Sequence, residues 1–486
     1  MLASVLALDV GTSMVKAVVV ATGGRVVREA STSVEPDGQP GVDTRAMWAV
    51  VHRTIAEAVA GLDPAEAPDA VIISAQGDGL WMIDSGGTPL ERAYLWNSSE
   101  GADAIARWDA RGVIEDHFRS TGTVLWPGSL AALWSWWRQA QPERVASVQS
   151  VMCAKDFVAY QLTGVIRTDL TDASIPFLDL ESGQYDSEAF ARLDCEDLRE
   201  RVAPVGVAGE VLGEVTATAS EATGLAPGTP VYLGALDVAA MLWGQGLGAP
   251  GDALAILGTT ALSASITDTL DFAGDPAGAT LSVGAGRYLR AMGSSAGAAT
   301  LEWFLSTMGY RGDARYDQMW ADVEAAPDGR EVFLPYLSGE RAPILAPYAT
   351  GSFHGLTGQT TRGGVARAVT EGIAMAMCRG IDRVLGSSGD SGQIVLTGGG
   401  AQATPWAQQV ANITGRAVAI DQRPHVGALG VAGLLIDTGT DSDRGVIGPN
   451  DRSDALRARY QDFIDLTDTL TPWWAATPAR IERPLP

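Results

Sequence analysis

Short apolar runs of strand length alternate with stretches in which apolar residues recur at helical spacing, and this alternation predicts an α/β protein. Near the amino terminus, apolar runs at 5–10 and 15–20 flank a short polar turn, which is the pattern of a β-hairpin. A helical repeat over 44–61 follows, and the apolar run 70–76 then predicts a buried strand. This strand runs into the letters QGDG, a loop that could face a ligand.

The same order of elements restarts after Pro230, with a strand at 231–236, then Asp237, a helix over 238–248 and a second hairpin at 254–266. Repetition of this kind predicts two similar lobes. We expect an amino-terminal lobe over 1–235 and a carboxy-terminal lobe over 236–486.

The two hairpins can be aligned by placing Gly258 on Gly11, which matches their glycine-threonine turns. In this alignment Ile256 stands opposite Asp9, and Asp237 lies outside the repeat. The tetrapeptide ALDV occurs twice, once containing Asp9 and once containing Asp237. Because only the first copy lies in an aligned hairpin, the two copies occupy different places in the two lobes.

Later segments continue the alternation. Helices are predicted at 296–308, 363–385, 405–414 and 427–438, and strands at 331–339, 393–400 and 416–421. The segment from Thr469 onward, rich in proline and alanine, is expected to lie on the surface.

Composition narrows the classes of function. A chain of 486 residues with 46% hydrophobic content can build two or three domains. No apolar run reaches the roughly 20 residues that cross a bilayer, so a cytoplasmic protein that does not enter a membrane is expected. A net charge of −24 argues against nucleic-acid binding. The three cysteines and four histidines lack zinc-site spacing, so any metal should prefer oxygen ligands.

Three glycine-rich turns follow predicted strands, at 9–13 (DVGTS), 257–260 (LGTT) and 398–402 (GGGAQ). Glycine lets backbone N–H groups approach an anion, so such turns can hold phosphate. Each alone is as consistent with an ordinary structural turn, but three in two matched lobes favour a polyphosphate in the cleft. The chain contains neither a Walker A sequence nor a dinucleotide-binding fingerprint.

Longer motifs carry a resemblance to a known family. These are LDVGTSMVKA near the start, KDFVAYQLTG followed by TDLTDAS, FLPYLSGERAPILAPYATGSFHGLT from Phe333, EGIAMAM from Glu371, and LTGGGAQATPWAQQVANITGRAV. In this order they resemble the FGGY family of carbohydrate kinases, most closely its xylulose kinase branch. The resemblance implies two ribonuclease-H-like lobes, as in actin and hexokinase, and ATP-dependent phosphorylation of a small sugar or polyol in the interdomain cleft.

The family pattern also implies roles for individual residues. Asp237 would be the general base, and Asp9 would hold Mg²⁺ through water in the family's manner. The residues implied to contact the nucleotide are Thr12, Ser13, Lys16, Gly258, Thr259, Thr260, Gly297, Gly399, Gly400 and Ala401. Taken without the family, the position of Asp237 favours a turn or cap residue over a catalytic one, and Lys16 is as consistent with a solvated strand end as with a phosphate contact.

The implied substrate side departs from the familiar branches. Its residues are Gln76, Gly77, Asp78, Trp96, Trp126 and Asp237. Glycerol kinases carry Arg-Glu and xylulose kinases Met-His where this chain has Gly77-Asp78, and Val238 replaces an amide residue. Asp78 could accept hydrogen bonds from sugar hydroxyls, and Trp81, Trp96 and Trp126 could form an apolar wall. These features resemble erythritol kinases, so a four- or five-carbon polyol is expected as readily as xylulose.

Two other functions fit the same fold. A sugar sensor would bind both ligands without turnover and would be expected to lack Asp9 or Asp237, which are both present. A filament-forming or chaperone-like ATPase would be expected to lack the long motif from Phe333. Assembly as a homodimer remains open at this stage.

Overall fold

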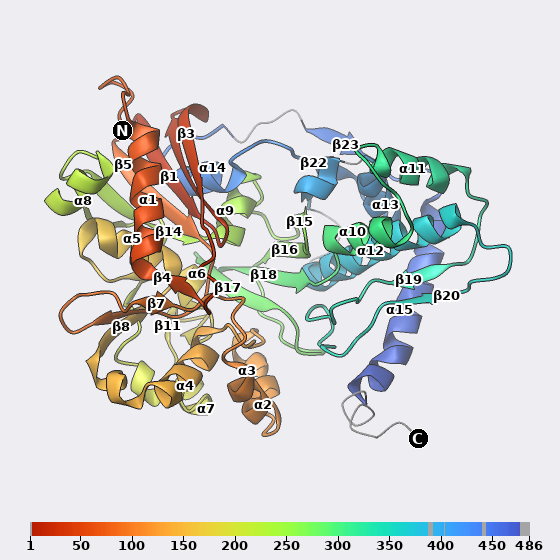
Figure 1. Ribbon diagram of the computed structural model, residues 1–486, viewed down its shortest axis with the longest axis horizontal. Coiled ribbons are helices and arrows are strands. Elements are labelled where there is room, and N and C mark those ends of the chain that lie inside the picture. The colour runs from red at the N-terminus through yellow and green to blue at the C-terminus, as the bar shows by residue number, and fades with distance from the viewer. Residues whose placement is uncertain (1, 387–391, 403, 440–443, 477–486) are drawn as a thin grey trace.

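The computed structural model describes residues 2–386, 392–402, 404–439 and 444–476, and it contains two lobes that lie side by side (Figure 1). The first lobe is built on a six-stranded sheet with the order β13-β14-β5-β1-β2-β3. Its strands are β1 (Ser4–Val10), β2 (Met14–Ala21), β3 (Arg25–Ser33), β5 (Ala70–Ala75), β13 (Val211–Glu214) and β14 (Pro230–Leu236).

The second lobe is built on a seven-stranded sheet with the order β17-β18-β16-β15-β21-β22-β23. Its strands are β15 (Ala253–Leu257), β16 (Ala261–Thr267), β17 (Ala279–Gly284), β18 (Arg287–Ser294), β21 (Ile394–Thr397), β22 (Val418–Ile420) and β23 (Gly445–Ile447).

The centres of the two sheets have the same design. In the first lobe, β1 pairs antiparallel with β2 and parallel with β5; in the second, β15 pairs antiparallel with β16 and parallel with β21. Both hairpins lie where the sequence alignment of Gly11 with Gly258 places them. The predicted α/β fold with two matched lobes is confirmed.

Helices pack on these sheets, and a further group of helices in the first lobe packs together beside its sheet (Figure 1). In the first half of the chain they are α1 (Thr44–Val59), α2 (Ala102–Asp109), α3 (Val113–Thr121), α4 (Leu130–Ala140), α5 (Ala154–Thr163), α6 (Leu170–Ala173), α7 (Ser187–Arg192), α8 (Ala217–Thr223) and α9 (Asp237–Gly244). In the second half they are α10 (Ala298–Thr307), α11 (Arg315–Ala325), α12 (Arg362–Leu385), α13 (Thr404–Thr414), α14 (Val426–Ala432) and α15 (Ser453–Ala475). No helix in the described ranges is both long and apolar enough to cross a membrane.

Short paired strands complete the fold. They are β4 (Val42–Asp43) with β7 (Arg92–Ala93), β6 (Trp81–Asp84) with β8 (Val148–Met152), β9 (Thr168–Asp169) with β12 (Val205–Gly206), β10 (Leu178–Asp179) with β11 (Gln184–Tyr185), and β19 (Val332–Leu334) with β20 (Ser352–His354). The pair β6 and β8 carries the segment after the QGDG loop, and the pair β19 and β20 carries the start of the long motif from Phe333.

Helices α9 and α14 join the two lobes. Leu429 of α14 belongs to the apolar cluster of Val5 in β1, whereas Leu242 of α9 belongs to the cluster of Leu254 in β15. The helices approach so closely that a Cβ on Gly430 would lie 1.8 Å from the carbonyl oxygen of Ala240. The chain therefore returns to the first lobe late in its course, and α14 is shorter than the helix predicted at 427–438.

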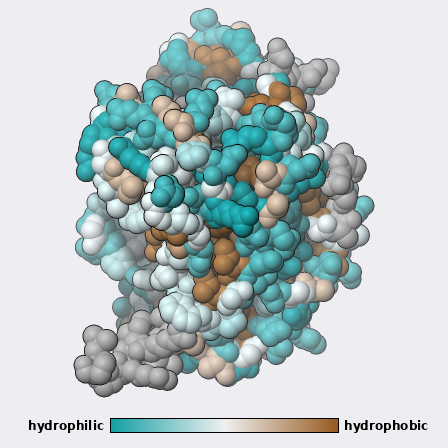
Figure 2. Space-filling model, turned by 90° about the vertical axis from the view of Figure 1, so that its right-hand side faces the viewer, coloured by the Kyte–Doolittle hydropathy of each residue, from teal (hydrophilic) through white to brown (hydrophobic). Residues whose placement is uncertain are grey.

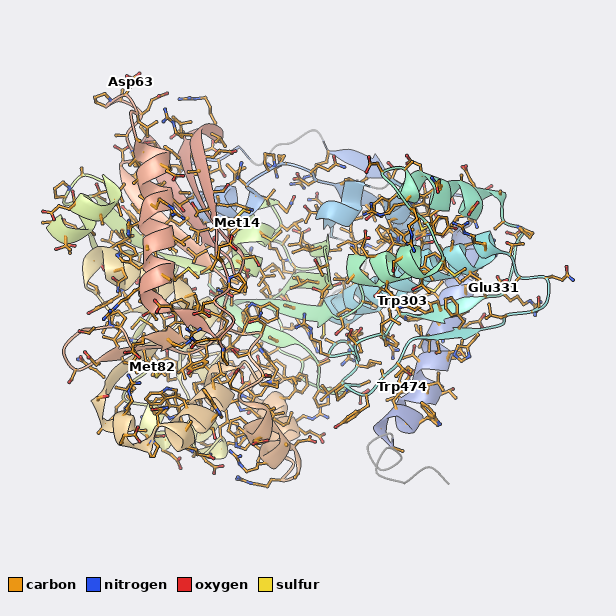
Figure 3. All side chains as sticks on the ribbon, viewed as in Figure 1. Met14, Asp63, Met82, Trp303, Glu331 and Trp474 are labelled. Atoms are coloured by element: carbon orange, nitrogen blue, oxygen red, sulfur yellow. The ribbon has the colours of Figure 1, made fainter. Side chains whose placement is uncertain are left out.

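One expectation about burial is wrong. Trp81 is 1% exposed and packs against Phe157 with 4.7 Å between ring centroids, so it belongs to the core and not to a sugar-binding wall. The segment from Thr469 continues α15 to Ala475 and lies on the surface as expected, except that Trp474 is 2% exposed and packs against Tyr336 (Figure 3). The rest of the expected surface tail, 477–486, lies outside the described residues.

The surface of the second lobe is largely polar. Figure 2 shows this end of the molecule as mostly hydrophilic, with hydrophobic groups in the middle of the face. Exposed apolar side chains of the loop after β19 include Leu337 and Leu345.

Candidate active site

Three parallel strands of the first sheet bring the expected catalytic residues to one edge. The strands β14, β5 and β1 are neighbours, and Asp237, the QGDG loop and Asp9 lie at their carboxyl ends. In the strand register, Ser74 of β5 pairs with Asp9 of β1 on one side and with Ala235 of β14 on the other. At about 4.8 Å between neighbouring strands, the backbones of β1 and β14 are roughly 10 Å apart. Asp9 and Asp237 therefore face one another across β5.

The environment of Asp237 suits a proton acceptor. Burial, the negative charge of Asp9 and a smaller effect of Asp172 raise the pKa of Asp237 to about 7, against a hydrogen bond from the backbone N–H of Val238. A base titrating near neutral pH can both hold and release a proton under working conditions. Asp237 lies in the first turn of α9, directly after β14.

Lys16 lies on the same side of the hairpin as Asp9. The two residues are direct cross-strand partners, and Lys16 Nζ lies 3.9 Å from Asp9 Oδ2. Their side chains are 40% and 31% exposed. Burial raises the pKa of Asp9, although the charges of Lys16 and His425 oppose this. A partly open carboxylate at a strand end is the type of ligand that Mg²⁺ prefers.

The turn after β1 is hydrogen-bonded to two of the residues expected to bind substrate. Thr12 Oγ1 donates to Gln76 Oε1 at 2.5 Å and accepts from Trp96 Nε1 at 3.2 Å, and Trp126 Nε1 donates to the Trp96 carbonyl oxygen at 2.8 Å. Trp96 and Trp126 stay partly exposed, while Ser13 is exposed at the tip of the turn. Gln76 Nε2 is buried without a hydrogen-bond partner among the described residues.

Asp78 has a structural partner that the sequence did not indicate. Its Oδ1 accepts from the N–H groups of Gly79 at 2.9 Å and of Leu130 at 2.6 Å, so it caps the first turn of α4. Its Oδ2 is buried and lacks a hydrogen-bond partner within the described residues. Burial raises the pKa of Asp78 well above its usual range. Only half of this carboxyl group therefore remains for a substrate hydroxyl.

Gly297 supports the turn of the second hairpin. A Cβ on Gly297 would lie 2.6 Å from both the carbonyl oxygen of Thr259 and the Cα of Thr260. The N–H group of Ala298 donates to the carbonyl oxygen of Gly258 at 2.8 Å. The N–H group of Ala299 donates to the carbonyl oxygen of Thr259 at 3.1 Å. The turn is thus held by the start of α10, and the Thr259 and Thr260 side chains remain exposed.

Glu340, which sequence reasoning missed, ties the long motif to this region. It is 2% exposed and accepts from Ser294 Oγ at 2.6 Å and from Ser295 N and Arg341 N at 2.8 Å. The neighbouring Arg341 places its guanidinium 5.7 Å from the ring centroid of Trp96 in the other lobe. The only signal for either residue was the motif that contains them.

The third glycine turn packs beside the second. Cβ atoms on Gly398 and Gly400 would lie 2.7 Å from the Leu257 carbonyl oxygen and 2.5 Å from Leu257 Cδ2, respectively, whereas a Cβ on Gly399 would point into open space. The backbone from Gly399 to Gln402, including Ala401, forms a 3₁₀ turn. The side chain of Ala401 lies outside the described part of the chain.

Comparisons with known proteins identify the family of the chain. Residues 4–244 match the amino-terminal domain, and residues 253–436 the carboxy-terminal domain, of the FGGY family of carbohydrate kinases. A xylulose kinase of Streptomyces coelicolor is 32% identical over 90% of this chain and 89% of its own length. An erythritol kinase of Brucella abortus is 25% identical over 88% of this chain and 86% of its own. The crystal structure of a xylulose kinase from Rhodospirillum rubrum superposes with a TM-score of 0.88, at 26% identity over 97% of this chain and all (100%) of that one.

Proposed function

Because the chain belongs to the FGGY family of carbohydrate kinases, we propose that it transfers the γ-phosphate of ATP to a hydroxyl group of a small sugar or polyol. The observation that carries this proposal is the carboxylate of Asp237, which titrates near neutral pH and faces Asp9 across β5. Asp237 accepts the proton of the substrate hydroxyl as its oxygen forms a bond to the γ-phosphorus and ADP leaves.

The carboxylate of Asp9 is partly exposed, and its oxygen atoms are of the kind that bind a magnesium ion. The ion would supply charge neutralisation on the phosphate oxygens when bound with ATP. Residues of both lobes would contact and position the nucleotide. The residues assigned to this task are Thr12, Ser13, Lys16, Gly258, Thr259, Thr260, Gly399, Gly400 and Ala401, with Gly297 supporting the second turn.

The substrate is proposed to be a xylulose-like ketopentose or an erythritol-like polyol. Gln76 Nε2 and Asp78 Oδ2 are buried polar atoms with unused hydrogen-bonding capacity, and both follow β5 directly. Trp96 and Trp126 supply partly exposed aromatic surface nearby. Short polyhydroxylated molecules match such a mixture, because their hydroxyls need polar partners and their carbon faces need apolar contact.

We expect ADP release to depend on one of these substrates. The measurement is a coupled assay with MgATP across glycerol, erythritol, threitol, the pentitols and the pentuloses. A sugar-dependent rate supports the kinase. Binding of a sugar and of ATP without any release of ADP would instead identify the non-catalytic sensor of the same fold.

Asp78→Ala is expected to raise the KM for the sugar by about 10-fold while the KM for ATP changes little, because a hydrogen bond to substrate is lost. Asp78→Asn keeps an oxygen that can accept from Leu130 N, so it separates the loss of the α4 cap from the loss of the substrate contact. We expect Asp78→Asn to retain α4 and the thermal stability of the wild type. Equal changes in both KM values for Asp78→Ala would contradict the substrate assignment.

A further inference from the structure

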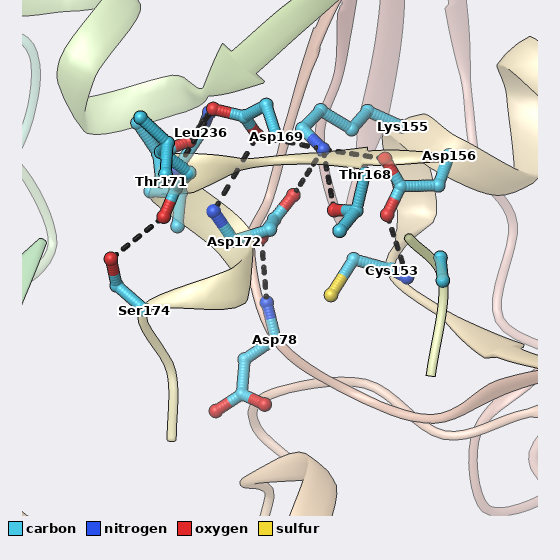
Figure 4. A network of polar contacts seen from close by, with 12 residues as sticks. Asp78, Cys153, Lys155, Asp156, Thr168, Asp169, Thr171, Asp172, Ser174 and Leu236 are labelled. Atoms are coloured by element: carbon cyan, nitrogen blue, oxygen red, sulfur yellow. Dashed lines mark hydrogen bonds and ion pairs between the residues drawn. The ribbon is translucent and has the colours of Figure 1, made fainter. Parts of the chain in front are cut away.

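A buried ion cluster lies behind the candidate site, centred on Lys155 at the first turn of α5 (Figure 4). Lys155 Nζ lies 2.5 Å from Asp156 Oδ1, 2.9 Å from Asp169 Oδ1 and 2.9 Å from Asp172 Oδ2. All four side chains are at most 2% exposed. One cation therefore holds three carboxylates in a fixed arrangement away from water.

One arm of the cluster reaches the candidate base. Asp169 Oδ2 accepts from the hydroxyl and from the N–H group of Thr171, both at 2.8 Å. Thr171 Oγ1 in turn accepts from Leu236 N at 2.9 Å. Leu236 is the last residue of β14 and immediately precedes Asp237. The hydroxyl of Thr171 thus links the ion cluster to the backbone that presents Asp237.

A second arm reaches the substrate loop. Asp172 contacts Lys155 through Oδ2 and accepts from Asp78 N through Oδ1 at 3.4 Å. The two arms also contact each other, because the Leu236 side chain packs against the backbone of Gly77. A Cβ added to Gly77 would lie only 2.2 Å from Leu236 Cδ1. The loop that carries Asp78 and the strand end that carries Asp237 are therefore packed together and tied to the same lysine.

A metal site is the other use for such a cluster. Ligand atoms of Cys153, Asp156 and Asp172 lie close enough to share an ion. The ammonium group of Lys155 already contacts both aspartates, and it supplies the positive charge that the carboxylates require. The arrangement is accordingly that of an internal ion cluster and not of an empty metal centre.

We propose that the Lys155 cluster positions the catalytic apparatus, with Thr171 as the positioning residue for Asp237 and Asp172 as the positioning residue for the Asp78 loop. This inference rests on the proposed kinase function. Loss of the Thr171 link should misplace the base and lower kcat, since displacements of about 1 Å can cost 10²-fold in rate. It should leave the KM values for sugar and ATP nearly unchanged, because the Asp172 link and the nucleotide turns remain.

The test compares Thr171→Val with Thr171→Ser and with the matched control Thr163→Val. Thr163 Oγ1 also accepts from a backbone N–H, that of Val165 at 3.1 Å, but it donates to the backbone oxygen of Ala159 at 2.8 Å instead of to a carboxylate, and it lies at the far end of α5. We expect kcat to fall about 10- to 100-fold in Thr171→Val, to recover to within about 3-fold of the wild type in Thr171→Ser, and to stay unchanged in Thr163→Val. Thr171→Ala serves as a second variant with the same expected loss if the valine side chain impairs folding.

Asp172→Ala tests the second arm, and here the KM for the sugar should rise more than kcat falls. Rates are expressed per folded molecule, from the amplitude of thermal unfolding. If Thr171→Val and Thr171→Ala keep the wild-type kcat, or lose activity only in proportion to their unfolded fraction, Thr171 is structural and the inference is overturned. Failure of the proposed function looks different, because the wild type itself would then show no sugar-dependent release of ADP.

Discussion

Asp237→Asn is expected to lower kcat by about 10²- to 10⁴-fold, which is the contribution of a positioned general base, and to change the KM values little. Asparagine has the size of aspartate but cannot accept the proton of the substrate hydroxyl. The reason to expect a large effect is that burial and the charge of Asp9 have raised the pKa of Asp237 into the working range. The measurement is steady-state ADP release at saturating sugar and MgATP.

Asp103→Asn is the matched control, since Asp103 also lies in the first turn of a helix, α2, but is exposed and belongs to a distant part of the first lobe. It should keep the wild-type kcat.

The base must be deprotonated to act, so kcat/KM of the wild type should fall about tenfold per pH unit below roughly pH 7 and level off above it. Asp237→Asn should lack this acidic limb. Wild-type turnover in Asp237→Asn would remove Asp237 from the proton transfer.

Lys155→Met lowers the free energy of unfolding by about 3–5 kcal/mol, because it leaves buried carboxylates without their counter-charge. Methionine fills most of the volume of the lysine stem, so the loss reflects charge and hydrogen bonding more than a cavity. The measurement is the midpoint of the urea-induced transition of the first lobe, followed by the fluorescence of its tryptophans. The midpoint should move to lower urea concentration.

Lys16→Met is the control for this change. Its partner Asp9 lies 3.9 Å away and both side chains are partly exposed, so the pair contributes at most about 1 kcal/mol. The comparison separates the general effect of removing a lysine from the specific effect of uncovering Asp169 and Asp172. Similar midpoints for the two variants would show that the buried carboxylates need no cation.

The sequence predicts those parts of the site that depend on local pattern. The hairpins around Gly11 and Gly258 follow from apolar periodicity and turn residues, and adjacent parallel strands then bring Asp9 and Asp237 to one edge. The cap that Asp78 gives to α4 and the clamp of Glu340 on Ser294 are contacts between segments distant in the chain. No local period encodes such contacts, because they exist only after the lobes have packed.

The aromatic residues show the same limit. Composition cannot distinguish Trp81, which fills the core, from Trp96, which remains open at the site. The segment from Thr469 lies on the surface as its composition predicts, but α15 continues through Pro472 and buries Trp474, which composition does not indicate. Tertiary packing overrides local propensity at such places.

The chain has two lysines, and their different burial makes the site open to selective chemistry. Lys155 is 2% exposed, whereas Lys16 is 40% exposed beside Asp9. Besides the α-amino group, a water-soluble amine acylating reagent therefore meets a single accessible lysine side chain, at the hairpin turn of the first lobe. A fluorophore attached there would sit next to the proposed phosphate contacts, so labelling needs no engineered cysteine, and the three native thiols are buried and out of reach.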